Sequence, residues 1–399
     1  MRNLIITLFL VLLMMVTVVH DNLHLSSVSE LSVRYHFNLH NWEVTRFPGK
    51  WLHWLGNTLY PFSEENQDES QLLQDYFQLG QDIVNAQNEL NQAVAAASDQ
   101  ASEMEQRLRR LQRDLKKLRP QTEEALEATI TDVLRQEGVP LNAGPFIFPP
   151  VDIALDSLPR ILVTSPRDHI ELTDSILLTP DISIAERREL EERIYAEEDV
   201  SALVENIGGI STYPAIITSS SLKSALVTAS HEWLHNYMFF HPLGWNYNRD
   251  GQMSTLNETT ADLFAQELGN LVYTHLTGEE PLRPPTGRAE PCPENRFCFN
   301  QEMRQTRLQV DSLLDQGSIE DAEAYMEEQR LAFVDNGYAI RKLNQAYFAF
   351  HGNYADSPSS VSPIHQQLLD LRNASASLAA FIHSLQSISS YDEFIALVQ

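Results

Sequence analysis

Two histidines stand four residues apart in an apolar stretch, and this spacing constrains the fold more than any other feature of the chain. The stretch reads His231-Glu232-Trp233-Leu234-His235. On an α-helix, residues four apart lie on one face, about 6 Å from each other, so both imidazoles can point at one ion. Glu232 lies beside His231, where its carboxylate can take a proton from a water held by that ion. The residues before the motif predict that one side of this helix is buried: Leu222, Ala225, Leu226 and Ala229.

A second segment supplies carboxylates at a workable distance. It reads Asn257-Glu258-Thr259-Thr260-Ala261-Asp262, and 22 residues separate His235 from Glu258, enough for a loop to return. A catalytic zinc site uses three protein ligands and keeps a fourth position open, which makes His231, His235 and Glu258 the expected ligands. Asp262 lies on the same helix face as Glu258. We expect it to accept the other ring N–H of a ligand histidine, His231 in the first place.

HEWLH followed by NETTAD resembles the gluzincin class of zinc peptidases, which includes the thermolysin-like enzymes. The resemblance covers roughly residues 210 to 275. It implies Zn²⁺ as the cofactor, held by the three ligands above, with Glu232 as the general base and Asp262 as the carboxylate that orients a ligand. It also implies that Ile210 to Thr218 forms the sheet edge beside the substrate cleft, where an extended peptide pairs with the backbone.

His241 offers a different third ligand. Metzincin peptidases place a third histidine at this spacing, and Met253 is a candidate for their methionine turn. Their motif needs a helix-breaking glycine at the position held here by Met238. If Met238 is helical, His241 lies about 240° around the helix from His235 and faces away from the ion. Pro242 indicates that the helix ends after His241, which favours the carboxylate ligand.

Peptide hydrolysis also needs a group that stabilises the oxyanion of the tetrahedral intermediate. In gluzincins a tyrosine or histidine from the C-terminal half often has this role. The segment around Gly352 offers His351 and Tyr354, and Tyr354 is the preferred candidate. The alternative is an ordinary helix end that carries a surface histidine and tyrosine.

The N-terminus carries a nearly unbroken apolar run from Leu4 to Val19, preceded by Arg2. A positive residue before such a run keeps the N-terminus in the cytoplasm and sends the rest across the membrane. Residues 1–21 are therefore predicted to be a signal-anchor or transmembrane helix, with the remainder extracytoplasmic. Because the run is short for a membrane span, a cleaved signal and a secreted protein are the alternative.

Residues 22–65 are an aromatic-rich juxtamembrane segment, in which the alternation from Val33 to Leu39 predicts a strand. Residues 66–137 read as helical and coiled-coil-like. Pro120 is expected to end or kink the helix. The apolar seam of this segment fits either a homodimeric coiled coil or an antiparallel hairpin that packs on itself. Its members step by four and three: Met104, Leu108, Leu111, Leu115 and Leu118.

Residues 138–399 are expected to form a zincin-like metallopeptidase domain. A Gly/Pro linker, Gly138 to Pro150, separates them from the helical segment and predicts that residues 66–137 can be removed without loss of zinc. Strand-like runs at Ile161–Val163 and Ile176–Leu178 precede the motif helix, and helices dominate afterwards. The expected fold class is α+β, with a small mixed sheet, an active-site helix and a mostly helical C-terminal half.

Local signals set the expected ends of three helices. Ser183 and Glu186 form a capping box for a helix that runs to about Val200. Ser219 to Ser221 offer N-caps for the helix that carries HEWLH. The next helix is expected from about Glu258 to Leu276.

Charge and cysteine content narrow the partners and the compartment. The net charge is -27, with 28 basic against 55 acidic residues, the opposite of the balance in nucleic-acid-binding proteins, so no nucleic-acid partner is expected. Cys292 and Cys298 are too few for a structural zinc site. They can form a disulfide in an oxidising compartment and would be free thiols in a reducing one.

The expected function is zinc-dependent hydrolysis of peptide bonds in a peptide or protein substrate, by a membrane-anchored, extracytoplasmic protein. One alternative is a zinc hydrolase that acts on a non-peptide amide. The other is a non-catalytic, membrane-tethered scaffold with a structural metal. An open fourth coordination position favours the two enzymes, whereas a fourth protein ligand such as His241 favours the scaffold.

Overall fold

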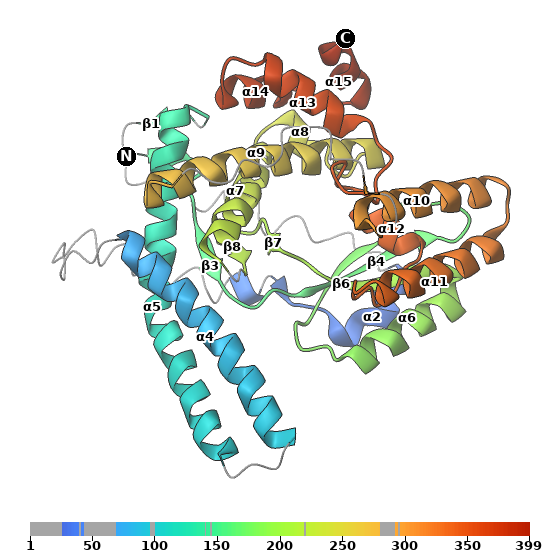
Figure 1. Cartoon of the computed structure of the whole chain (residues 1–399). Helices are drawn as coiled ribbons and strands as arrows, with labels where there is room; N and C mark the ends of the chain where they lie inside the picture. Colours follow the sequence, from blue (N-terminus) through green and yellow to red (C-terminus); the bar gives the residue numbers. More distant parts are fainter. Residues whose placement is uncertain are drawn as a thin grey trace.

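The computed structural model describes residues 26–39, 41–43, 69–95, 100–139, 141–143, 146–218, 221–279, 292–293 and 296–399 (Figure 1). The expected membrane anchor at residues 1–21 lies outside this part of the chain. Within it, no helix combines the length and the apolar character that a membrane span requires.

The α+β class is confirmed, because small sheets are followed by a mostly helical C-terminal half (Figure 1). One antiparallel sheet has the order β5–β4–β6, and the two expected strands belong to it. A mixed sheet has the order β3–β8–β7, in which β3 runs parallel and β7 antiparallel to β8. The strands are β1 (Leu141–Ala143), β2 (Phe146–Phe148), β3 (Ile153–Leu155), β4 (Arg160–Pro166), β5 (Ser175–Leu178), β6 (Val200–Asn206), β7 (Gly209–Ile210) and β8 (Ala215–Ile217).

The strand expected from Ile210 to Thr218 is two strands, so that prediction was wrong in detail. The chain turns between β7 and β8, where Pro214 has no N–H to donate to a ladder and the Thr212 hydroxyl donates to Pro214 O at 2.7 Å. As a result β8 lies at the centre of its sheet and β7 at its edge.

Side-chain caps fix the helices near the motifs. The predicted capping box of Ser183 and Glu186 begins α6, and Ser221 caps α7 by accepting from Ser224 N. Asp250 caps α9, which therefore starts well before the expected Glu258. The helices are α2 (Ser27–Ser32), the 3-10 turn η1 (Val33–Tyr35), α4 (Glu69–Ala95), α5 (Ala101–Glu137), α6 (Ile184–Glu198), α7 (Leu222–Met238), α8 (Pro242–Trp245), α9 (Gly251–Thr277), α10 (Phe299–Asp315), α11 (Ile319–Asp335), α12 (Gln345–His351), α13 (Ile364–Ala374), α14 (Leu378–Leu385) and α15 (Tyr391–Val398).

One further sequence expectation was wrong. Residues from Val33 to Leu39 do not form a strand: η1 follows α2 there, Tyr35 is buried in a cluster with α6 and the β4 sheet, and His36 alone makes a bridge to Leu178. Pro120 lies inside α5 and does not end it, and the expected kink stays a prediction. Because Pro120 is exposed, the carbonyl that lacks a helical donor one turn earlier can be hydrated.

Helices α4 and α5 form an antiparallel hairpin whose far end projects from the body (Figure 1). The apolar seam therefore packs the two helices of one chain against each other, which is the antiparallel-hairpin alternative of the sequence analysis. Where the hairpin meets the body, its side chains join the main core with α7 and α9, including Leu73 of α4, Leu126 of α5 and Trp233 of α7. Removing residues 66–137 would uncover this core, so we now expect the truncated chain to be unstable. The domain bounds themselves stay a prediction.

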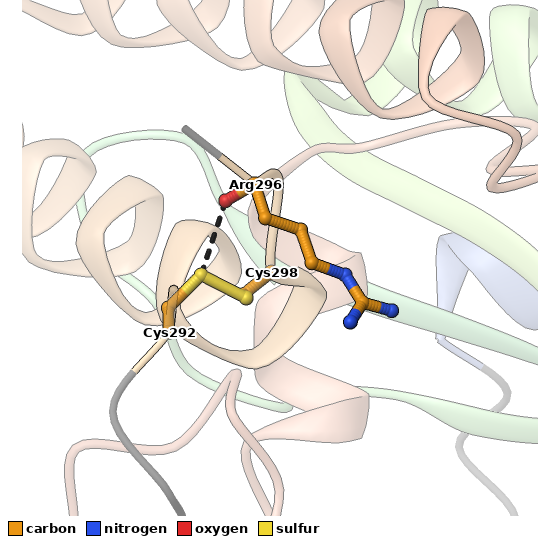
Figure 2. The surroundings of a disulfide bond; sticks show 3 residues. All are labelled: Cys292, Arg296 and Cys298. Atoms are coloured by element: carbon orange, nitrogen blue, oxygen red, sulfur yellow. Dashed lines mark hydrogen bonds between the residues drawn. A yellow bond between two sulfur atoms is a disulfide. The ribbon is translucent and has the colours of Figure 1, made fainter. Parts of the chain in front are cut away.

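Cys292 and Cys298 form a disulfide just before α10 (Figure 2). A disulfide is typical of oxidising compartments, which favours the expected extracytoplasmic location.

Two glutamates of α5 close the outer edge of the mixed sheet. Leu155 N donates to Glu123 Oε1 at 2.8 Å, and Ile153 N donates to Glu127 Oε1 at 2.7 Å. In the described part of the chain β3 is the edge strand of this sheet, and its N–H groups point to α5 where a further strand could pair. The carboxylates satisfy them and block the edge against another strand.

Replacing Glu123 with alanine should lower the free energy of unfolding by about 1–3 kcal/mol, because the buried Leu155 N–H would lose its acceptor. Urea denaturation followed by circular dichroism measures the change. Glu105→Ala on the same helix is the matched control: its side chain is exposed and, among the described residues, pairs with Arg109, so its midpoint should hardly move. Equal midpoints for the two variants would contradict this account of the sheet edge.

Candidate metal centre

Two adjacent helices carry the side chains of both sequence motifs. Helix α7 lies beside α9 in the centre of the molecule (Figure 1), and their facing sides are buried in the main core. His231 and His235 come from α7, and Glu258 and Asp262 from α9. The apolar packing of these two helices therefore brings the two motifs together.

His231, His235 and Glu258 form a compact group that could hold a metal ion. The Nε2 atoms of the two histidines are 3.0 Å apart. Glu258 Oε2 lies 3.3 Å from His231 Nε2 and 3.5 Å from His235 Nε2. A tetrahedral ion with bonds of about 2.0–2.2 Å separates its ligand atoms by about 3.3–3.6 Å. The two distances to Glu258 fall in this range, whereas the two histidine nitrogens are slightly closer, so a small movement of the rings would let all three atoms bind one ion.

The surroundings of Glu258 fit the same interpretation. Its Oε2 atom is buried and makes no hydrogen bond of acceptable geometry within the described residues, although two imidazole nitrogens are near. A buried carboxylate oxygen normally has a partner, and a cation is one that satisfies it. Burial by itself would raise the pKa of Glu258, but the two histidines, His235 foremost, hold that pKa well below its usual value. The carboxyl is thus ionised, as a ligand must be.

Asp262 orients one of the histidines. Its Oδ1 atom lies 2.9 Å from His231 Nδ1, so the Nδ1–H points at the carboxylate and Nε2 is left to face Glu258 and His235. Burial lowers the pKa of His231, but the carboxylates of Asp262 and Glu258 outweigh it and hold that pKa well above its usual value. A cation bound at Nε2 of His231 would displace the proton from that nitrogen and leave the Nδ1–H that faces Asp262.

Glu232 is buried beside the group without belonging to it. Its carboxylate lies under the backbone of β7: a Cβ added at Gly209 would stand 2.3 Å from Glu232 Oε1. Burial raises the pKa of Glu232, and the charges of His231 and His235 oppose that rise only in part. A carboxylate held next to three ligand atoms, with a raised pKa, suits proton transfer.

Tyr354 lies at the same site, whereas His351 does not line its cavity. The ring centroid of Tyr354 is 6.4 Å from that of His231. The loop that carries Tyr354 is tied to α9, because Ala355 N donates to Thr259 Oγ1 at 3.0 Å and Asn353 Oδ1 accepts from Thr255 Oγ1 at 3.1 Å. The charge of Glu258, together with burial, holds the pKa of Tyr354 well above its usual value, so the hydroxyl keeps its proton.

Tyr247 is a site residue that the sequence did not reveal. Its hydroxyl donates to Glu258 Oε1 at 2.5 Å and fixes the orientation of the carboxylate whose other oxygen faces the histidines. Burial, and then the charge of Glu258, raises the pKa of Tyr247. No periodic pattern marks this residue, because it reaches Glu258 through the irregular turn between α8 and α9. In the sequence, only the position of Tyr247 between the two motifs pointed to it.

His241 does not join the group, so the metzincin arrangement is absent from the described residues. Helix α7 ends at Met238, so the expectation that it ends after His241 was wrong. The turn that follows does not bring His241 back to His231 and His235. Instead, His241 packs against Tyr237 with ring centroids 4.6 Å apart. Burial and the nearby His383 lower the pKa of His241.

The group opens into a cavity of about 730 Å³. Besides the site residues, its walls include the edge strand β7, the sheet residues Ile161 and Leu177, and the aromatic residues Phe239 and Phe350. The ligand atoms are therefore reachable by a molecule larger than water, which a purely structural metal site would not require.

Comparisons of the chain with protein-family models, with curated proteins and with solved structures found no match.

Replacing Glu258 with alanine should sharply reduce bound metal, because one of three ligands is lost and two imidazoles remain. His241→Ala should keep its metal, since that ring lies outside the group. Inductively coupled plasma mass spectrometry of the purified, dialysed proteins gives the metal per chain. Metal that is kept by Glu258→Ala and lost by His241→Ala would mean that the ligands are those of the metzincin arrangement.

Proposed function

We propose that this protein is a zinc-dependent peptidase of gluzincin type that acts outside the cytoplasm. One observation carries the proposal: three ligand atoms, from His231, His235 and Glu258, converge beside the buried carboxylate of Glu232 at the wall of an open cavity. Two imidazoles and one carboxylate are a common ligand set of catalytic zinc. The predicted N-terminal anchor would tether the protein to a membrane.

Zinc bound there supplies Lewis-acid polarisation of a carbonyl and makes a water acidic near neutral pH. The chain contributes a fixed geometry. Asp262 sets the ring orientation of His231, and Tyr247 sets that of the Glu258 carboxylate. Both contacts are made to the ligand side chains and not to the ion. They prevent His231 and Glu258 from rotating away from the site.

Glu232 is the proposed general base and acid. Because its pKa is raised, Glu232 takes up a proton at a pH closer to neutral than an exposed glutamate does. The carboxylate accepts a proton from the attacking water and passes it to the amine nitrogen of the leaving peptide. Because the Glu232 carboxylate lies directly beneath β7, we propose that it serves both proton transfers from this one position.

The substrate backbone is proposed to lie along β7. This strand is the edge of its sheet, its residues line the cavity, and Glu232 lies directly beneath it. An extended peptide that pairs with the edge would place a carbonyl near the three ligand atoms. Tyr354, whose hydroxyl keeps its proton, is the proposed donor to the oxyanion.

Glu232→Gln should keep bound zinc and thermal stability, while peptide hydrolysis falls by about 10²- to 10⁴-fold, the usual contribution of general acid–base catalysis. Cleavage of a fluorogenic peptide library and metal analysis on the same preparations provide both readouts. Loss of zinc by this variant, as in His235→Ala, would make Glu232 a ligand. A zinc-loaded wild type that cleaves no peptide would refute the proposed activity.

Gly209→Ala should lower hydrolysis at least tenfold without loss of zinc, because the new methyl group would force the Glu232 carboxylate or β7 to move. The neighbouring Gly208→Ala is the matched control, since a Cβ there meets nothing within 4 Å. Kinetics of the two variants on one peptide would separate the predictions. Equal rates for Gly208→Ala and Gly209→Ala would show that the contact has no catalytic consequence.

A further inference from the structure

Basic residues are concentrated in one stretch of the projecting hairpin. Seven of the 28 basic residues of the chain lie between Arg107 and Arg119, a stretch with one acidic residue, Asp114. The chain as a whole is strongly acidic, and α4, the other helix of the hairpin, carries four acidic residues and no basic one. The overall composition therefore does not explain this stretch.

Five of these basic side chains share one face of α5, and all five are exposed. Successive residues of a helix are turned by about 100°, so the five fall within an arc of about 120°. The centre of the arc lies opposite the apolar seam that packs on α4, and no acidic residue between Gln106 and Pro120 falls within it. We call these five residues the cationic stripe: Arg109, Arg110, Arg113, Lys116 and Lys117.

Carboxylates of the same helix neutralise only part of the stripe. Arg109 pairs with Glu105 at 2.5 Å, and Lys117 pairs with Asp114 at 3.1 Å. Exposed pairs of this kind are weak, so a stronger anionic partner can replace them. Three members of the stripe make no ion pair with any described residue: Arg110, Arg113 and Lys116.

The stripe lies just beyond the point where α5 leaves the body. Arg119 lies 3.7 Å from Asp156, which follows β3, and Glu123 one turn later contacts β3 itself. On the other side of Arg119 the hairpin projects from the body (Figure 1). From Arg109 to Lys117 the stripe is about 12 Å long. A broad surface can therefore reach all five side chains at once.

We propose that the cationic stripe docks on the headgroups of an anionic lipid bilayer, so that the hairpin is a membrane contact in addition to the predicted anchor. Charge complementarity identifies this occupant. The five cations are spread along a convex helix face, which suits an extended layer of phosphates better than a single ligand. Groups of four to eight basic residues on one helix face are typical of binding to anionic lipids. The predicted anchor would keep such a surface within reach.

Docking would orient the body of the protein. Because the net charge of the chain is -27, anionic headgroups repel most of the molecule and attract the stripe. The two forces together turn the hairpin toward the bilayer and hold the acidic body away from it. This proposal goes beyond the proposed peptidase activity, and it uses none of the residues of the metal centre.

A fluorophore on the hairpin tests the proposal. Gln106, an exposed residue within the arc, is replaced by cysteine in the full chain and labelled with nitrobenzoxadiazole while the native disulfide stays closed. The protein is reconstituted with vesicles of phosphatidylcholine, with or without phosphatidylglycerol, that carry a nitroxide-headgroup lipid as quencher. Quenching should be at least about fivefold stronger with phosphatidylglycerol, since each basic residue near an anionic surface contributes about that factor. High salt should abolish the difference.

The same label on the other helix of the hairpin is the positional control. Asn88 is exposed on α4, and its neighbour Glu89 pairs with Arg107, so residues 88 and 106 lie at similar distances from the body. A label at Asn88→Cys should show little quenching in either kind of vesicle.

Two charge reversals test the stripe itself in the chain labelled at residue 106. Arg113→Glu, at the centre of the stripe, should reduce the phosphatidylglycerol-dependent quenching at least about twofold. Arg188→Glu makes the same change of charge at an exposed position of α6 and should leave that quenching intact. Both variants should keep their melting temperatures, because both side chains are exposed.

Equal quenching in the two kinds of vesicle, or an equal effect of Arg113→Glu and Arg188→Glu, would overturn the proposal. So would a dimer in detergent that Arg113→Glu dissociates, seen by sedimentation, while the quenching is unchanged. The stripe would then bind a second copy of this acidic chain.

The quenching experiment needs neither zinc nor hydrolysis, which separates this proposal from the proposed catalysis. A zinc-loaded protein that cleaves no peptide, yet shows quenching that depends on Arg113, would refute the peptidase and support the docking surface. Cleavage of peptides without any such quenching would support the peptidase and refute the docking surface.

Discussion

A carboxylate held between two imidazoles is the interaction on which the rest of the site depends. Glu258 is buried, and its Oε2 atom lies 3.3 Å from His231 Nε2 and 3.5 Å from His235 Nε2. Ionised groups are costly to bury unless opposite charge compensates them. With Glu232 and Asp262 close by, the cluster is rich in negative charge, and a divalent cation at the three ligand atoms would balance it. The packing of α7 against α9 supports this arrangement.

The surrounding elements hold the cluster from several sides and leave one side open. Tyr247 and Asp262 fix the ligands, and hydrogen bonds from α9 hold the loop with Tyr354 in place. The two edges of the mixed sheet have different neighbours. Carboxylates of α5 close the β3 edge, whereas the β7 edge lines the cavity. Of these two edges, β7 is the one that lies beside His231, His235 and Glu258.

Much of this centre could be predicted from the sequence, because local geometry determines it. Residues four apart on a helix share a face. His231 and His235 therefore point in the same direction, and so do Glu258 and Asp262. Capping residues such as Ser221 set helix starts by satisfying free N–H groups. The α+β class followed from strand-like runs before helical ones. The rule that a proline ends a helix did not hold at Pro120, which lies inside α5 at an exposed position where water can reach the carbonyl that loses its helical donor.

The sequence by itself therefore determined which residues could be ligands, on which helix faces they lie, and that a cation could bind among them. Only the tertiary structure decided that Glu258 and not His241 completes the group, that Tyr247 holds the carboxylate, and that β7 covers Glu232. These features join residues through turns and through packing between separate elements. Such contacts leave no periodic trace in the chain, since their geometry is set by how the elements fit together and not by the spacing of residues along any one of them.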